Sequence, residues 1–115
     1  MAKECVFCRI VSGELPGEVV YQDESFLAFR DVSPQAPTHV LIVPKEHITS
    51  LADLTDEQEE LAERLVTLAR HVAQGEGIAK DGYRLVINCG PEGGQEVPHL
   101  HLHLLGGRRL SGRLG

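Results

Sequence analysis

The sequence has few basic residues, and this shortage limits its partners. Eleven Lys and Arg oppose seventeen Asp and Glu in 115 residues, which gives a formal net charge of −6 at pH 7. An acidic surface repels a phosphate backbone rather than attracting it. We therefore do not expect this protein to bind nucleic acid.

Long apolar runs are also missing. The apolar stretches extend over only a few residues, whereas a membrane-spanning helix needs about 20. The polar start MAKEC has no apolar core of the kind that a signal peptide requires. We expect a cytoplasmic protein that does not associate with membranes.

Cysteine is scarce, and its spacing is uneven. Cys5 and Cys8 are separated by two residues, and Cys89 stands apart. In a reducing compartment, an odd number of cysteines with one close pair indicates metal or redox chemistry before a disulfide. We expect Cys89 to be buried as a small hydrophobic residue.

The remaining composition is that of an ordinary globular protein. Hydrophobic residues make up 42% of the chain and charged residues 24%, which argues against disorder and against a fibrous protein. A chain of this length forms one hydrophobic core. We therefore predict a single domain that covers residues 1–115.

Residue patterning predicts an α+β layer architecture. Thr55 and Gln58 form a possible capping box at the start of a long helix, in which Leu61, Leu65, Leu68 and Val72 follow helical spacing. Short runs rich in β-forming residues, bounded by Gly and Pro, indicate strands. The expected elements are a short helix at 5–12, strands at 19–22, 25–32, 39–44, 83–89 and 97–105, and the long helix from 55 to about 74.

The last predicted strand contains the most informative pattern. In VPHLHLHLLGG, residues 97–107, His99, His101 and His103 alternate with leucines. Side chains two residues apart on a strand lie on the same face, so the leucines anchor the strand in the core and the imidazoles form a row in a cleft or on a polar surface. A row of bases whose ordinary pKa is about 6.5 indicates a metal or an anion.

From these residues alone, metal and anion interpretations both stay open. Three histidines are a known zinc arrangement, and the pair Cys5 and Cys8 with two histidines would form a Cys2His2 zinc site. The glycine-bearing loop at 90–96 leads into the histidine strand, and its backbone N–H groups could contact phosphate oxygens. In that case one imidazole could attack phosphorus while a second, protonated one offsets charge or protonates the leaving group.

Several segments of the sequence are similar to the hallmark motifs of one known family. HLHLHLL at 99–105 resembles the His-x-His-x-His-x-x signature of the histidine-triad (HIT) nucleotide-binding family, and 31–48 resembles its second hallmark segment. The opening CVFCRIVSGELP and the segments 81–88 and 93–108 are similar to the Hint branch in order and spacing. The resemblance implies a homodimer in which each subunit carries a five-stranded antiparallel sheet. It also implies hydrolysis of purine nucleoside phosphoramidates, such as adenylate joined to an amine.

The resemblance implies a role for each matching residue. His101 would attack the α-phosphorus and form a nucleotidyl-histidine intermediate, and His103 would hold the phosphate or help to protonate the leaving group. His39 would support the nucleophile, and Asp31 would accept the ribose hydroxyls. The other implied nucleotide contacts are Phe7, Ile10, Phe29 and Val32 around the base and Asn88, Gly94 and Gln95 at the phosphate.

The start of the chain is similar to bacterial relatives that begin C-x-x-C and bind zinc. Transferred by position, the ligands would be Cys5, Cys8, His47 and His99. This zinc would be structural, because it leaves the other two triad histidines free of metal, and catalysis would require no cofactor.

The sequence departs from the family pattern in two places. Glu96 stands where many Hint-branch members have serine, and a carboxylate there would repel phosphate unless it is protonated or turned away. The tail RRLSGRLG lacks the frequent Trp-Pro-Pro ending, and we expect Arg108 and Arg109 to be a solvated charge pair. We also expect His71 to face solvent.

Three other functions stay open at the level of sequence. Within the same fold, the protein could be a dinucleoside polyphosphate hydrolase. In a different class, it could be a non-catalytic nucleotide-sensing or scaffolding dimer. A zinc enzyme that uses all three triad histidines as ligands is the third alternative.

Overall fold

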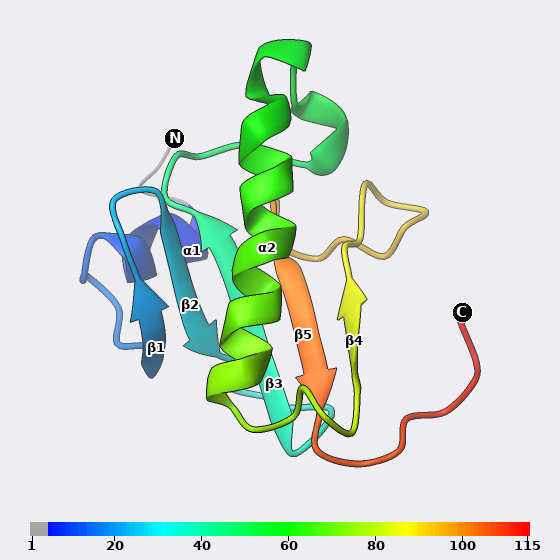
Figure 1. The fold of residues 1–115 in the computed structure, drawn as a ribbon. Helices are drawn as coiled ribbons and strands as arrows, with labels where there is room; N and C mark the ends of the chain where they lie inside the picture. Colours follow the sequence, from blue (N-terminus) through cyan, green and yellow to red (C-terminus); the bar gives the residue numbers. More distant parts are fainter. Residues whose placement is uncertain (1–4) are drawn as a thin grey trace.

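The computed structural model describes residues 5–115, in which one antiparallel sheet has helices on both faces (Figure 1). The strands run in the order β1-β2-β3-β5-β4, which confirms the expected α+β fold. The elements are α1 (Val6–Val11), β1 (Val19–Gln22), β2 (Phe26–Arg30), β3 (Thr38–Pro44), the 3-10 turns η2 (Leu51–Asp53) and η3 (Asp56–Gln58), α2 (Glu59–Gly75), β4 (Tyr83–Val86) and β5 (Leu102–Gly106).

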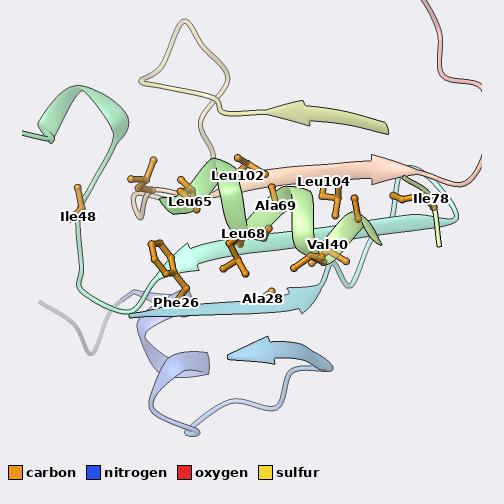
Figure 2. Packing of buried hydrophobic residues seen from close by; sticks show 14 residues of the cluster. Phe26, Ala28, Val40, Ile48, Leu65, Leu68, Ala69, Ile78, Leu102 and Leu104 are labelled. Carbon is orange, nitrogen blue, oxygen red and sulfur yellow. The ribbon is translucent and has the colours of Figure 1, made fainter. Parts of the chain in front are cut away.

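The central strand β3 separates two apolar layers. All seven of its residues are buried, because α2 covers one face of the sheet and α1 lies behind the other face (Figure 1). Val40 and Ile42 pair with Leu104 and Leu102, and all four belong to the cluster that includes the buried residues of α2. Figure 2 shows Val40, Leu102 and Leu104 beside α2. Leu41 belongs to the smaller cluster on the α1 side. Alternation along the strand therefore produces one large core and one smaller apolar layer.

The long helix begins and ends with specific contacts. The Thr55 backbone N–H donates to Gln58 Oε1 at 3.0 Å, and the first turn, η3, is a 3-10 turn that leads into α2. Beyond its last turn, Glu76 accepts two hydrogen bonds from Arg30 of β2, at 2.8 and 3.1 Å. The Arg30–Glu76 contact therefore ties the end of the helix to the sheet. The buried residues of α2 are Leu65, Leu68, Ala69, Val72 and Ala73.

Three predicted strands are shorter in the structure. The strand expected at 97–105 forms only from Leu102 to Gly106, because the Leu100 N–H donates to Ile48 O and the His99 N–H to Val97 O. The strand expected at 83–89 ends at Val86, and the one expected at 25–32 covers Phe26–Arg30. The leucine alternation is nevertheless confirmed, since Leu100, Leu102 and Leu104 are at most 1% exposed.

Cys89 and His71 differ in how well their exposure could be predicted. Cys89 is half-exposed rather than buried, because the strand that would have carried it into the sheet ends three residues earlier. His71 on α2 is exposed, as expected. Within residues 5–115, no helix combines the length and the apolar character needed to cross a membrane.

Truncation of the core face of β5 will destabilise the fold. Leu102 is 1% exposed beneath α2, so Leu102→Ala is expected to lower the free energy of unfolding by about 2–5 kcal/mol, through lost burial and the cavity left behind. The matched control is Leu51→Ala, because Leu51 is 39% exposed and its truncation is expected to cost less than about 1 kcal/mol. Urea unfolding measures both, and equal losses would contradict this assignment of the core.

Candidate functional site

A cleft lies on the face of the sheet opposite α2. His39 and Leu41 of β3 point to this face, and Leu41 pairs with His103 of β5. The cleft has a volume of about 390 Å³. Its lining residues come from α1, from β3, from the loops that follow β2 and β4, and from the histidine segment (residues 99–103): Phe7, Asp31, Ser33, Gln35, His39, Leu41, Asn88, Gly94, Glu96, Val97, His101 and His103.

The ring of His101 is fixed in one tautomer. Its Nδ1 lies 2.7 Å from the backbone carbonyl oxygen of His99. A carbonyl oxygen can only accept a hydrogen bond, so Nδ1 carries the hydrogen. In the neutral ring, Nε2 therefore has a free lone pair. The Phe7 ring packs edge-on against the imidazole, with centroids 5.0 Å apart and planes at 82°, and holds its orientation.

His39 and His103 form a hydrogen-bond chain with a defined direction. The Gln35 backbone N–H donates to Nδ1 of His39 at 3.1 Å, so a neutral His39 carries its hydrogen on Nε2. That Nε2 lies 3.0 Å from Nδ1 of His103 and 3.5 Å from Oδ2 of Asp31. His103 therefore accepts at Nδ1, and its own hydrogen is on Nε2.

Burial keeps both of these histidines neutral. Burial is the largest cause that lowers the pKa of His103 to about 4; the neighbouring His101 and His39 rings act in the same direction, and the charge of Asp31 opposes them. Burial also lowers the pKa of His39, and Asp31 again acts in the opposite direction. At neutral pH the two rings are hydrogen-bond donors and acceptors without charge.

A separate group of ligand-type side chains joins α1 to the histidine segment. The sulfur and nitrogen ligand atoms of Cys5, Cys8, His47 and His99 all lie within 4.8 Å of one another. Cys5 Sγ and Cys8 Sγ lie 3.2 and 3.5 Å from Nδ1 of His99, and Cys8 Sγ lies 3.2 Å from Nδ1 of His47.

The chemistry of this donor set fits a tetrahedral zinc ion. Neighbouring S and N ligands on zinc are separated by roughly 3.6 Å, given the usual bond lengths, close to the spacing found here. Nε2 of His99 donates to the Pro44 carbonyl at 2.9 Å, so its Nδ1 lone pair faces the thiols. Without a metal, burial, together with the hydrogen bond and the charge of Cys5, raises the pKa of the Cys8 thiol to about 11.

Asp31, His39 and His103 also place ligand-type atoms within 4.8 Å of one another, but their hydrogen-bonding argues against a metal. The Gln35 N–H occupies the Nδ1 lone pair of His39, so the neutral ring keeps a hydrogen on Nε2 and has no lone pair for an ion. Among the described residues, the three triad histidines share no common ligand group. The geometry therefore does not support a three-histidine zinc enzyme.

The expected base contacts differ in position. Phe29 is 3% exposed and packs against Phe7, with ring centroids 5.5 Å apart. Ile10 is half-buried beside the same cluster. Val32 is 96% exposed. None of these three residues lines the cleft. Phe7 is the residue of the expected base set that lines the cleft.

The expected phosphate contacts are arranged around the loop after β4. Asn88 lines the cleft and its side-chain amide donates to Gly93 O at 2.7 Å, and Gly94 also lines the cleft. The side chain of Gln95 is not part of the lining: it donates to Thr49 O at 2.7 Å and accepts from the Gly90 N–H at 2.9 Å. Gln95 therefore braces the loop.

Sequence reasoning missed several lining residues, and Gln35 is the most consequential. Its contribution to His39 is made by a backbone N–H, which no side-chain pattern records. Ser33, Leu41 and Val97 also line the cleft. Glu96, noted as a departure from the family, is exposed and contributes a carboxylate to the wall.

The sequence is similar to a known family and to proteins of known name. The HIT domain family matches residues 12–110. The chain is 52% identical over 110 residues to a purine nucleoside phosphoramidase of Escherichia coli K12, covering 96% of this chain and 92% of the relative. It is 50% identical over 108 residues to a 14 kDa zinc-binding protein of Zea mays, covering 92% and 84%.

A solved structure shares the whole fold. The HIT family hydrolase of Legionella pneumophila Philadelphia 1 superimposes with a TM-score of 0.94 at 51% identity, and the match covers 97% of this chain and all of the other. The signature histidines, the five-stranded sheet and these similarities lead to the same conclusion: the protein belongs to the histidine-triad (HIT) family.

Proposed function

We propose that this protein hydrolyses purine nucleoside phosphoramidates through a covalent nucleotidyl-histidine intermediate on His101. The observation that carries this proposal is the fixed tautomer of His101, whose Nδ1–H donates to His99 O at 2.7 Å and whose Nε2 lone pair is free in a residue that lines the cleft. The relative in Escherichia coli that is named for this activity supports the choice of substrate.

The first chemical step transfers the nucleotidyl group to the enzyme. The Nε2 lone pair of His101 forms a bond to the α-phosphorus, the bond from phosphorus to the amine nitrogen breaks, and its electron pair stays on that nitrogen. The amine takes a proton from solvent at the open side of the cleft and leaves. In the second step water attacks phosphorus, its proton returns to solvent, and the electron pair of the broken bond returns to Nε2.

The His39–His103 pair supports the phosphate without carrying charge. His103 lines the cleft with a hydrogen on Nε2, because its Nδ1 accepts from His39. A neutral donor of this kind can bind a phosphoryl oxygen as negative charge develops in the transition state. A pKa of about 4 for His103 favours this role over protonation of the leaving group.

Other residues of the cleft would position the nucleoside. Asp31 would accept the ribose hydroxyls with one carboxylate oxygen, while its Oδ1 accepts the Ser33 N–H at 2.8 Å. Phe7 would contact the base, and Asn88 and Gly94 would contact the phosphate. The remaining expected contacts would have indirect roles. Ile10 and Phe29 would support Phe7 by packing, Gln95 would brace the loop after β4, and Val32 would contact the base only from outside the cleft.

We infer that Cys5, Cys8, His47 and His99 hold one structural zinc ion. Bound zinc would replace thiol protons and tie α1 to the histidine segment, while catalysis would use no cofactor. We infer also that the protein is a cytoplasmic homodimer. The edge of β4 away from β5 has no partner strand among residues 5–115, and such an edge supports pairing with a second copy.

Replacement of His101 tests the nucleophile. His101→Gly is expected to lower kcat for an adenylate-amine substrate by at least about a thousandfold, since no other group would form the covalent bond. Rapid alkaline quenching and mass spectrometry of the wild type are expected to show on His101 the added mass of one nucleotidyl group, which is a nucleoside monophosphate less one water. The matched control is His71→Asn on the exposed surface of α2.

Three outcomes separate the alternatives. Normal turnover by His101→Gly would reject the nucleophile assignment. Faster cleavage of a diadenosine polyphosphate than of the adenylate-amine would favour the dinucleoside polyphosphate hydrolase. Tight nucleotide binding with no turnover of either substrate would favour the sensing or scaffolding dimer.

Metal removal is expected to act on stability first. Metal analysis of the purified protein should give about one zinc per chain, and Cys5→Ser and Cys8→Ser should each lose it. At a zinc concentration 1,000 times Kd, the bound ion adds about 4 kcal/mol to the free energy of unfolding, so chelation will lower Tm. Cys89→Ser, which changes a cysteine outside the group, is the control, and loss of zinc from that variant would contradict the ligand set.

Acidification will destabilise the protein through His103. The pKa of this residue falls from 6.5 to about 4 on folding, so between these values the unfolded chain binds the extra proton. The stability that neutral His103 contributes is complete above about pH 6.5 and is lost as pH falls toward 4, with a slope below about 1.4 kcal/mol per pH unit. In His103→Asn, Tm measured over this range should vary less steeply, and an unchanged slope would contradict the assignment.

A further inference from the structure

Two neighbouring arginines in the tail make different contacts. Arg108 Nη2 donates to the Gln35 carbonyl at 2.9 Å, and its Nη1 donates to the Arg109 carbonyl at 3.0 Å. The guanidinium of Arg108 therefore joins the chain after β5 to the loop between β2 and β3. Arg108 and Arg109 are both exposed, as expected, but Arg108 also makes these two hydrogen bonds.

The backbone brings these two segments together. Thr38 at the start of β3 pairs with Gly106 at the end of β5, so both segments leave the sheet at the same end (Figure 1). Gly107 has φ +94°, and a Cβ at this position would lie 2.9 Å from Pro37 Cβ and 3.4 Å from the Thr38 nitrogen. The absence of a side chain lets the tail pass close to the loop and directs Arg108 toward Gln35.

The residue that Arg108 holds is the one that sets the tautomer of His39. The carbonyl of Gln35 accepts from Arg108, and its N–H donates to Nδ1 of His39 at 3.1 Å. Gln35 is exposed, and its side-chain amide donates to Ser33 O at 3.0 Å within the same loop. Arg108 thus supplies a link between Gln35 and a segment outside the loop.

We propose that Arg108 is a positioning residue for the histidine relay. By holding Gln35, it keeps the backbone N–H on Nδ1 of His39, so that the hydrogen of His39 stays on Nε2 and donates to His103. The kinetic consequence rests on the proposed function, whereas the effect on the His39 tautomer does not.

Loss of this contact has a defined effect on the imidazole. When the Gln35 N–H moves away, Nδ1 of His39 is free to carry the hydrogen, and Nε2 then has only a lone pair. Nδ1 of His103, which accepts from His39 at 3.0 Å, would face that lone pair and lose its donor. The ring of His103 is then no longer held in the form that presents Nε2–H to the phosphate.

The test reads the tautomer directly. Histidine-selective 15N NMR of the zinc-loaded full chain at neutral pH, with the signals of His39 assigned through His39→Asn, is recorded for the wild type, Arg108→Ala, Arg108→Lys and Arg109→Ala. We expect a single Nε2–H form of His39 in the wild type and a mixture with the Nδ1–H form in Arg108→Ala. Arg108→Lys, which keeps a donor for the carbonyl, should restore most of the Nε2–H form.

Steady-state kinetics with an adenylate-amine substrate are the second measurement. Arg108→Ala is expected to lower kcat by roughly tenfold with a smaller change in KM, less than the 10²–10⁴ that loss of a whole acid–base group produces. Arg108→Lys should recover most of that loss. Arg109→Ala removes an adjacent exposed arginine side chain and should match the wild type in the NMR spectrum of His39 and in the kinetics.

Two results would overturn the proposal: a His39 that stays wholly in the Nε2–H form in Arg108→Ala, or an equal tautomer change in Arg109→Ala. Thermal unfolding of each variant shows whether the fold is kept, and a folded Arg108→Lys tests the proposal even when the alanine variant is unstable. If the wild type turned over no phosphoramidate, the proposed function would fail while the NMR comparison would still decide the role of Arg108.

Discussion

The chemistry of the site depends on hydrogen bonds between imidazole rings and backbone groups. A carbonyl oxygen accepts and an amide N–H donates, so each such contact determines which ring nitrogen has the lone pair. His99 O fixes His101, Pro44 O fixes His99, and the Gln35 N–H fixes His39. Four similar side chains thereby acquire different hydrogen-bonding states: a base with a free nitrogen, a ring whose lone pair faces two thiols, and the donor and acceptor of a neutral pair.

His99 links the two parts of the site. Its side chain belongs to the group with the two cysteines, and its backbone carbonyl receives the hydrogen of His101. Phe7 lies between Cys5 and Cys8 in the sequence and packs against the imidazole of His101. An ion on the cysteines would therefore restrain the position of the ring on which the proposed reaction depends, without contacting the substrate. The proposed metal ligation and the proposed chemistry thus use different side chains that share one segment of backbone.

Much of the fold could be predicted from the sequence, because its signals are local. The alternation of His and Leu, the apolar face of the long helix and the Thr55–Gln58 contact each depend on residues within a few positions of one another. The late start of β5 at Leu102 could not be predicted, since the N–H of Leu100 is taken by the carbonyl of Ile48, far away in the sequence. The fixed tautomers could not be predicted either, because they depend on backbone carbonyl and N–H groups, which no side-chain motif records.

The charge of the cleft wall has a consequence for product departure. Asp31 and Glu96 place carboxylates on the wall, and none of the described residues that line it is Lys or Arg. A nucleoside phosphoramidate carries one negative charge on its phosphoryl group, whereas the released monophosphate carries about −1.5 to −2 at neutral pH. In the proposed reaction, hydrolysis would therefore raise the electrostatic repulsion between the wall and its occupant, and the charge that the reaction creates would favour departure of the spent nucleotide.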